Sequence, residues 1–245
     1  MPLEFLRPAV DGVGEGVADR VVVGFNWTAI HSAGHVGLAW SPRGIAGART
    51  TAETGTYAGR SLAELALLCR SDNPYERSIG LAAVNAYWNR PSDALAEGDG
   101  LATWSQESDA RRKELERTVV IGRFPNLDSK FPGATVVELE PREGEIAFAD
   151  AGSRIAAAQA VVMTASTLVN NTAESILDLV PQTARVTIVG PSVPLCPGLL
   201  DGPVRRLAGF VVSKPNQAFS AVMEGAGAKA LKRFGRSVTL TVSQV

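Results

Sequence analysis

The sequence predicts an α/β protein in which a small α+β half is followed by a mainly parallel sheet with helices on both faces. Three observations carry this prediction. The first hundred residues hold short β-branched runs and then two helices with clear start signals. The rest of the chain alternates short apolar runs with helical segments. The chain has 245 residues, 45% of them hydrophobic, which is enough to bury a substantial core.

The amino-terminal strands are predicted to form a small antiparallel sheet. The β-branched run at residues 21–25 leads into the polar-aromatic segment 26–28 and is expected to form one strand with it. A second short strand is expected at residues 36–40, because turn-forming residues follow it at 41–44.

Two helices come next, each predicted from its first residues. Ser61 and Glu64 have the spacing of a capping box, in which the Ser61 hydroxyl accepts from the backbone N–H of Glu64 and the Glu64 carboxylate reaches back to the cap. Asn73 is a second expected cap, with Pro74 at the first helical position. This second helix is expected to run to about Trp88.

A change in composition predicts a domain boundary. Between residues 90 and 117 the chain turns to charged and small residues, and the run 107–114 is typical of a solvated linker helix. The sequence therefore predicts a first domain at residues 1–105 and a second at 106–245.

Five buried strands are predicted beyond this boundary, at residues 118–122, 135–139, 160–165, 185–190 and 207–212. Because these runs are apolar on both faces and alternate with helices, they favour a mainly parallel sheet. The helices are expected at residues 149–158, at 172–180, and from 216 to 234 with a break near 225–227.

Charge and hydropathy argue against two classes of partner. A formal charge of -1, from 24 basic and 25 acidic residues, gives no electrostatic case for nucleic acid. The longest mostly apolar stretch, residues 155–165, is far short of the roughly 20 residues that cross a bilayer, so no membrane role is expected. The amino terminus shows no secretory signal, and the cytoplasm is the expected location. A homodimer is the default expectation for a protein of this kind.

Soft metal ligands are scarce in the sequence. Cys69 and Cys196 are too few for a disulfide framework or a zinc site of clustered thiolates, and both are expected to be reduced, packed thiols. His31 and His35 are four residues apart, but Gly34 and a strand-like context argue against the helix that would align them on a metal.

Candidate site residues follow the predicted strands, because ligands of open α/β sheets bind beyond the carboxyl ends of the strands. Gly122 is followed by Arg123, Phe124 and Pro125 rather than by further glycines, so ordinary NAD binding is disfavoured. Glu138 ends the next strand, where a carboxylate either accepts hydrogen bonds from ribose hydroxyls or is simply solvated.

Hydroxyl and amide side chains concentrate after the third of these strands. They are Thr164, Ser166, Thr167, Asn170, Asn171 and Thr172. A helix with Glu174 in its first turn is expected to follow, and free N–H groups at a helix start can hold an anion. The alternative is that Asn171 or Thr172 caps this helix, with Glu174 completing a capping box.

Two further polar residues complete the candidates. Ser192 lies in the proline-rich loop 190–197, near the same sheet edge. Asn85 lies on the helix that starts at Pro74, among apolar and small side chains, so its carboxamide needs partners. It is expected either to fix the packing between domains or to face a ligand in the cleft.

Six segments in order resemble a known family: GLAAVNAYWN (80–89), VVIGRFP (119–125), VVELEP (136–141), MTASTLVNNT (163–172), GPSVPLCP (190–197) and LAGFVVS (207–213). The strand at 21–28 and GLAWSP at 37–42 extend the likeness to nearly the whole chain. They resemble a bacterial and archaeal family of unknown function described as putative heavy-metal chelation proteins. The resemblance implies an enolase-N-terminal-like domain, a Rossmann-like domain, and a site in the cleft between them.

The family's site residues can be carried over onto matching positions. The resemblance implies Asn85 on the long helix, Glu138 at the strand end, Thr164, Asn170 and Thr172 in the polar segment, and Ser192 in the Gly-Pro-Ser loop. The chain departs from the family where Ala165 and Ser166 follow Thr164, and where Val193 replaces a threonine.

The leading hypothesis is that a small anionic or metal-chelating ligand binds in the interdomain cleft. The cofactor is unknown from the sequence, with a metal ion or metal chelate as the candidate. The ligand-binding residues would be Asn85, Glu138, Thr164, Ser166, Asn170, Thr172 and Ser192. The alternative is an enzyme, a transferase or lyase, acting on a nucleotide-like or pterin-like substrate. A third hypothesis is an accessory protein of metal homeostasis that acts through a partner.

Overall fold

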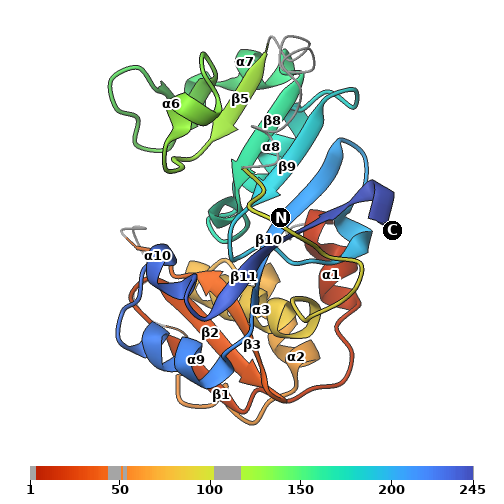
Figure 1. Ribbon diagram of the computed structural model, residues 1–245, viewed down its shortest axis with the longest axis vertical. Helices are drawn as coiled ribbons and strands as arrows, with labels where there is room; N and C mark the ends of the chain where they lie inside the picture. The colour runs from red at the N-terminus through yellow and green to blue at the C-terminus, as the bar shows by residue number, and fades with distance from the viewer. Residues whose placement is uncertain (1–3, 44–50, 52–53, 102–116, 245) are drawn as a thin grey trace.

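The computed structural model describes residues 4–43, 51, 54–101 and 117–244, and it contains two β-sheets with helices packed around them (Figure 1). The smaller sheet lies in the lower part of Figure 1, with α2, α3 and α9 around it. The larger sheet fills the upper part, and its strands β10 and β11 reach down toward the smaller one. The predicted fold class, a small antiparallel sheet and a large mainly parallel one flanked by helices, is confirmed.

The small sheet is antiparallel and runs in chain order. It consists of β1 (Arg20–Val23), β2 (Trp27–Ser32) and β3 (His35–Trp40). The single strand expected over residues 21–28 is therefore wrong, because the chain turns between Val23 and Trp27 and begins β2 there. The polar-aromatic segment belongs partly to this turn and partly to a strand that pairs with both neighbours.

The two predicted helices of this half begin where their caps are. Ser61 Oγ accepts from the backbone N–H of Glu64 and starts α2 (Leu62–Ala66), which continues as the 3-10 helix η2 (Leu67–Arg70). Asn73 accepts from the N–H of Tyr75 and starts α3 (Pro74–Trp88). The Glu64 carboxylate binds Arg60 instead of completing the capping box.

Within the described residues the large sheet has eight strands, in the order β4-β11-β10-β9-β8-β5-β6-β7. The strands that pair in parallel are β5 (Thr118–Ile121), β6 (Thr135–Glu138), β7 (Ile146–Ala147), β8 (Ala160–Thr164), β9 (Arg185–Val189) and β10 (Val204–Val212). The antiparallel strands β11 (Gly235–Thr241) and β4 (Ala96–Glu97) complete one edge. The strand order β7-β6-β5-β8-β9-β10 is that of a doubly wound sheet. The chain starts at the central strand β5, adds β6 and β7 on one side, and then returns to add β8, β9 and β10 on the other side.

The described helices of the second half are short. They are α6 (Leu127–Lys130), α7 (Gly152–Ala156), α8 (Ala173–Leu179), α9 (Pro215–Met223) and α10 (Ala228–Leu231). The described 3-10 helices of this half are η3 (Phe148–Asp150), η4 (Ala165–Leu168), η5 (Pro197–Leu199) and η6 (Val242–Gln244). The expected break near residues 225–227 separates α9 from α10. The sequence did not predict β4, β7 or β11, and the expected linker helix at residues 107–114 lies outside the described residues.

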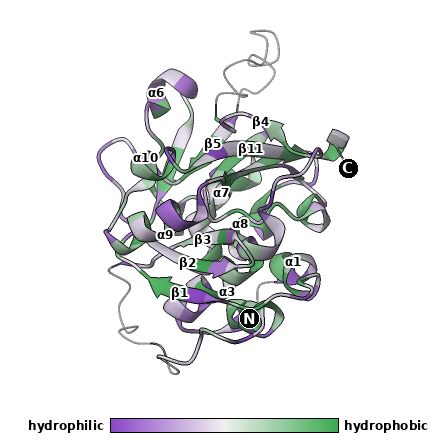
Figure 2. Cartoon of the chain, turned by 60° about the horizontal axis from the view of Figure 1, so that its bottom comes forward, coloured by the Kyte–Doolittle hydropathy of each residue, from purple (hydrophilic) through white to green (hydrophobic). Residues whose placement is uncertain are grey.

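Apolar side chains project from both faces of the large sheet. Val161 and Met163 of β8 belong to one hydrophobic cluster, and Val162 between them belongs to another. In Figure 2 the strands carry many hydrophobic residues, and hydrophilic ones are visible at α6. Burial on both faces explains why these strands read as continuous apolar runs.

The two halves of the chain share hydrophobic cores. Trp27 and Leu38 of the small sheet pack in one cluster with Phe210 of β10 and Phe219 of α9. The amino-terminal segment adds η1 (Glu4–Leu6) and α1 (Arg7–Asp11), and α1 contacts η5. The boundary at residue 105 remains a prediction, and β4, which precedes it, pairs with β11.

No described helix combines the length and the apolar character that a membrane-spanning helix needs.

Candidate functional site

A pocket of about 260 Å³ lies at the carboxyl ends of β5, β6 and β8. It occupies the place where the chain direction across the sheet reverses, between β5 and β8, which is where ligands of such sheets bind. Its lining residues are Trp40, Ile121, Gly122, Arg123, Val137, Glu138, Leu139, Phe148, Thr164, Ser166, Thr167, Asn170 and Thr172. Trp40 is the last residue of β3, so the small sheet contributes to the wall.

The structure brings most of the predicted site residues together. Those that line the pocket are Glu138, Thr164, Ser166, Asn170 and Thr172. Asn85 and Ser192 are not among the lining residues and are almost fully buried elsewhere.

Asn85 lies inside the contact between α3 and β3. Its side chain is 0% exposed, and its Nδ2 donates to the carbonyl of Leu38 at 2.7 Å. Its Oδ1 has no hydrogen-bond partner in the described structure. Both partners lie in the first predicted domain, so this hydrogen bond holds a helix against a strand there and is not the expected packing between domains.

Ser192 reaches the pocket only through another residue. Its Oγ accepts from the backbone N–H of Trp40 at 2.8 Å, which ties the loop after β9 to the end of β3. Ser192 therefore fixes the position of a residue in the pocket wall.

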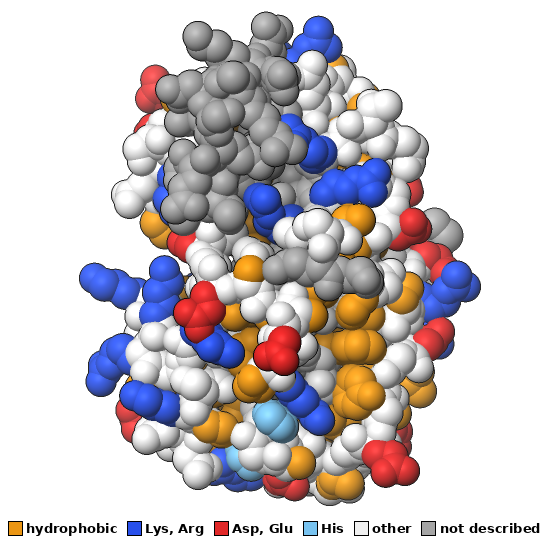
Figure 3. All heavy atoms as spheres, turned by 45° about the vertical axis from the view of Figure 1, so that its right-hand side comes forward, with side chains coloured by type: hydrophobic (Ala, Val, Ile, Leu, Met, Phe, Trp, Pro, Cys, Tyr) orange, Lys and Arg blue, Asp and Glu red, His pale blue; other side chains and the backbone are white. Residues whose placement is uncertain are grey.

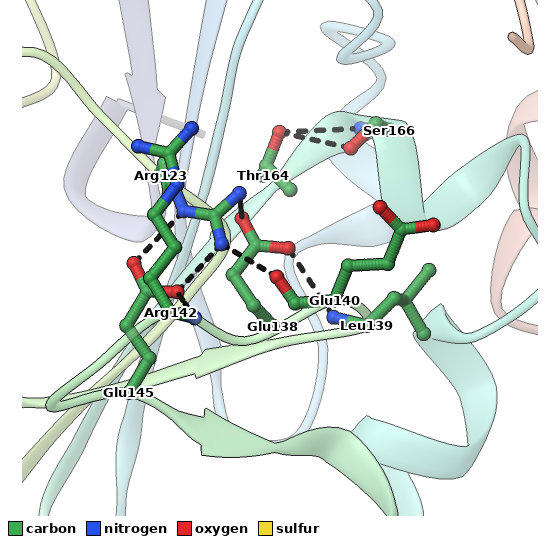
Figure 4. Close-up of polar contacts among 8 residues, drawn as sticks. All are labelled: Arg123, Glu138, Leu139, Glu140, Arg142, Glu145, Thr164 and Ser166. Atoms are coloured by element: carbon green, nitrogen blue, oxygen red, sulfur yellow. Dashed lines mark hydrogen bonds and ion pairs between the residues drawn. The ribbon is translucent and has the colours of Figure 1, made fainter. Parts of the chain in front are cut away.

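Arg123 and Glu138 line one part of the pocket, and Glu145 binds Arg123 from outside the lining (Figure 4). The Arg123 guanidinium donates from Nε and Nη2 to the two carboxylate oxygens of Glu145, at 2.8 and 2.6 Å. Its Nη2 also donates to the Glu140 carbonyl. Its Nη1 lies 3.8 Å from Oε1 of Glu138, too far for a hydrogen bond.

The Arg123 contact fixes the charge of Glu145. Hydrogen bonds from Arg123, and then from the backbone N–H of Arg142, lower the pKa of Glu145 from 4.5 to about 2. Glu145 is thus ionised at any physiological pH and holds the guanidinium in place. Because Nη1 of Arg123 is not used by Glu145, it remains a potential donor at the pocket edge.

The Glu138 carboxylate keeps most of its hydrogen-bonding capacity. Its Oε2 accepts from the N–H of Leu139 at 3.2 Å, and its Oε1 has only the distant Arg123 contact. A carboxylate offers about four acceptor positions, so several remain for a ligand. Its side chain is 19% exposed, which leaves it accessible at the pocket surface.

The end of β8 contributes hydroxyl groups to the pocket. Thr164 ends β8, and its Oγ1 lies 3.2 Å from Oγ of Ser166 (Figure 4). The hydroxyl of Thr167 donates back to the Thr164 carbonyl at 2.6 Å. Gly122 permits this arrangement, because a Cβ there would lie 2.6 Å from Cγ2 of Thr164.

Asn170 and Thr172 form a local pair. Oδ1 of Asn170 accepts from both the hydroxyl and the N–H of Thr172, at 2.7 and 3.2 Å. The alternative of a helix cap is wrong for α8, since neither Thr172 nor Asn171 caps it by a side-chain hydrogen bond and Glu174 accepts from the N–H of Glu4. The Asn170 amide nitrogen makes no hydrogen bond to a described residue and can donate to a ligand.

Apolar side chains that were not predicted from the sequence complete the pocket. Leu139 and Phe148 line it beside Glu138, and Trp40 lines it from β3. Phe148 follows the two-residue strand β7, which is too short to leave a pattern. Trp40 ends a predicted strand, but only the packing of β3 against the large sheet places it here.

The described residues do not fit a heavy-metal ion. No group of three or more His, Cys, Asp or Glu side chains in that part of the chain could hold one. Soft metals prefer thiolates, and both cysteines are free and buried. Burial raises the pKa of Cys69 to about 12 and also raises that of Cys196, so neither is a ready thiolate.

Comparisons with known proteins give a consistent result. A family model described as "Putative heavy-metal chelation", DUF364, matches residues 106–241, more than half of the chain. A second model with the same description, DUF4213, matches residues 9–88. No curated protein matches the chain.

Two crystal structures of the DUF364 family, both of proteins with unknown function, share the fold. The one from Desulfitobacterium hafniense has 28% sequence identity and a TM-score of 0.85, with 98% of each chain covered. The one from Pyrococcus horikoshii has 20% identity and a TM-score of 0.82, with 97% of this chain and 98% of that chain covered, and this likeness concerns the fold alone.

Proposed function

The chain belongs to the DUF364 family, described as putative heavy-metal chelation, and from this premise we propose that it binds a small metal-chelating or anionic organic molecule in the pocket at the ends of β5, β6 and β8. The observation that carries the proposal is the donor set of that pocket. A carboxylate with free acceptor positions, one guanidinium nitrogen and several hydroxyl and amide groups face a common space.

This donor set suits the organic part of a chelate better than a bare metal ion. Small chelators carry hydroxyl and carboxylate groups, which can donate to Glu138 and accept from Arg123, Thr164 or Asn170. The described residues offer no cluster of metal ligands, so the metal in such a complex is held by the chelator's own atoms. We propose that the pocket is the cleft expected from the sequence, with Trp40 as its contribution from the first half.

Titration calorimetry with three probes tests the proposal: Ni²⁺ alone, citrate alone and the Ni²⁺–citrate complex. We expect the complex or citrate to bind one site, and Ni²⁺ alone to show no site that depends on the pocket. Thr164→Val and Asn170→Ala should each weaken binding about tenfold, because each removes a polar contact worth roughly 1.4 kcal/mol.

Thr183→Val is the matched control, since Thr183 is exposed and does not line the pocket. If Ni²⁺ alone binds tightly and the pocket variants leave the affinity for every probe unchanged, the proposal that a ligand binds in this pocket is wrong. Native mass spectrometry of the freshly purified protein adds a check, because a retained organic molecule would appear as extra mass.

An enzyme of the transferase or lyase class, acting on a nucleotide-like or pterin-like substrate, is the second candidate. The observation in its favour is that Glu138 is the one carboxylate among the described lining residues, where it could act as a general base. In that case Glu138→Gln lowers kcat more than it raises KM, whereas a binding protein loses only affinity.

A further inference from the structure

The end of β6 presents Glu138 to the pocket in a particular setting. Gly122 follows β5 with a φ of 96°, and Glu138 ends the adjacent parallel strand sixteen positions later. In doubly wound sheets, a carboxylate about twenty residues after the first strand's glycine turn is the group that accepts hydrogen bonds from ribose hydroxyls.

The free acceptor positions of Glu138 suit two neighbouring hydroxyls. Oε2 has one backbone hydrogen bond at 3.2 Å, and Oε1 has no hydrogen bond to a described residue. A vicinal diol can donate one hydroxyl to each oxygen without displacing the Leu139 N–H. Glu145 and the Glu140 carbonyl occupy Nε and Nη2 of the Arg123 guanidinium, and its Nη1 lies 3.8 Å from Oε1 of Glu138, beyond hydrogen-bond length, so both carboxylate oxygens keep acceptor positions for the diol.

Apolar surface lies directly beside this carboxylate. Leu139 is 57% exposed although it lines the pocket, and Phe148 lines it from the end of β7. Exposed apolar area costs about 25 cal/mol per Å², so a flat ring that covers these side chains would be stabilised. The order of strands therefore places a diol-binding carboxylate next to a surface suited to a heteroaromatic base.

The turn after β5 excludes a dinucleotide. Gly122 is followed by Arg123, Phe124 and Pro125, so it lacks the glycines that admit a pyrophosphate, and proline has no N–H to offer. A nucleoside has no pyrophosphate, so its binding needs no backbone N–H groups from this turn. Its 5′ substituent would extend toward the hydroxyl groups of Thr164 and Ser166 at the end of β8.

We propose that the pocket recognises a ribonucleoside group, with the ribose diol on Glu138 and the base against Leu139 and Phe148. This inference rests on the proposed function, because it uses the same pocket. It identifies the part of the ligand that binds at the ends of β6 and β7.

Calorimetric titration with adenosine, uridine and their 2′-deoxy forms tests this assignment on the full chain. Wild-type protein should bind at least one ribonucleoside and prefer it at least tenfold over its 2′-deoxy form. Glu138→Gln should weaken the ribonucleoside about tenfold and leave the 2′-deoxy form nearly unchanged. Leu139→Ser should weaken both forms equally, because it alters only the contact to the base.

Glu143→Gln is the matched control, since Glu143 is exposed, close in sequence and outside the pocket lining. Absence of ribonucleoside binding at millimolar concentration, or binding without preference for the 2′-hydroxyl, overturns the inference. If the Ni²⁺–citrate titration still responds to Thr164→Val in that case, the pocket retains its proposed function and only the nucleoside assignment fails. If neither probe responds to any pocket variant, both proposals fail.

Discussion

At the scale of single residues, the pairing of Arg123 with Glu145 determines how the pocket edge responds to acid. The pKa of Glu145 falls to about 2 in the folded protein, from an ordinary value of 4.5. A carboxyl group whose folded pKa is lowered stabilises the protein above its unfolded pKa, and that stabilisation is lost as the pH falls.

The first prediction concerns Glu145→Gln. The difference in free energy of unfolding between wild type and variant should be constant above about pH 5 and shrink as the pH falls from 4.5 toward 2. Urea unfolding at pH 7, 5 and 3 measures it. Glu143→Gln should show no such trend, and a Glu145→Gln difference that grows toward pH 3 would contradict the assigned pairing.

The second prediction concerns Gly122→Ala. Its φ of 96° strains any side chain by roughly 1–3 kcal/mol, and the new Cβ would also lie 2.6 Å from Cγ2 of Thr164. Gly144→Ala is the matched control, because its φ of 83° carries the same strain with open space around the Cβ. Thermal denaturation should show a greater loss for Gly122→Ala. Adding Thr164→Ser, which removes Cγ2, should recover part of that excess, and no recovery would mean that the contact is unimportant.

The residues of the candidate site were predictable to different degrees. Glu138 and Thr164 end apolar runs, so strand prediction alone placed them at the sheet edge. Phe148 and Trp40 could not be predicted, because their position depends on a two-residue strand and on contact between sheets.

At the scale of elements, α3 and β3 pack unusually closely. A Cβ on Gly37 would lie 2.1 Å from the Ala82 carbonyl and from the Ala86 nitrogen, so only glycine fits this strand position. Asn85, on the same face of α3, donates to the Leu38 carbonyl. The Asn85 carboxamide and the absence of a Cβ at Gly37 together set the distance between α3 and the small sheet.

The third prediction follows from this contact. Asn85→Ala should lower the free energy of unfolding by about 1–3 kcal/mol, because it leaves the buried Leu38 carbonyl without its donor. Binding of Ni²⁺–citrate at the pocket should remain unchanged. Chemical denaturation and calorimetry on the same variant separate the two effects. Weaker Ni²⁺–citrate binding with an unchanged free energy of unfolding would show that Asn85 acts in ligand binding rather than in packing.

At the scale of the whole molecule, shared cores couple the two halves of the chain. Besides the cluster around Trp27 and Phe219, Asn89 at the end of α3 donates to the Val193 carbonyl at 2.8 Å and accepts from the N–H of Leu195 at 2.9 Å. These contacts should make unfolding a single cooperative event.

The fourth prediction uses the two buried thiols as separate reporters. Cys69 lies in the first half and Cys196 in the second, and both are free and buried. Pulsed alkylation across a urea series, read by mass spectrometry, should label both cysteine thiols at the same urea concentration. Two midpoints, with Cys69 and Cys196 labelled at different concentrations, would show that the halves unfold independently.

The homodimer expected from the sequence remains a prediction. On the face shown in Figure 3, hydrophobic side chains gather over the lower half of the molecule, the part that holds β1–β3 in Figure 1. Native mass spectrometry gives the subunit count directly.

The sequence by itself determined the fold class, the main strands and the strand-end polar residues, because hydrophobic periodicity, caps and turn residues act over a few neighbouring positions. The tertiary structure alone decided which of those residues share a pocket. It separated Asn85 and Ser192 from Glu138 and Thr164, and it added Trp40 and Phe148 to the wall. The reason is that contacts between segments far apart in the chain depend on strand order and sheet packing, which no local pattern encodes.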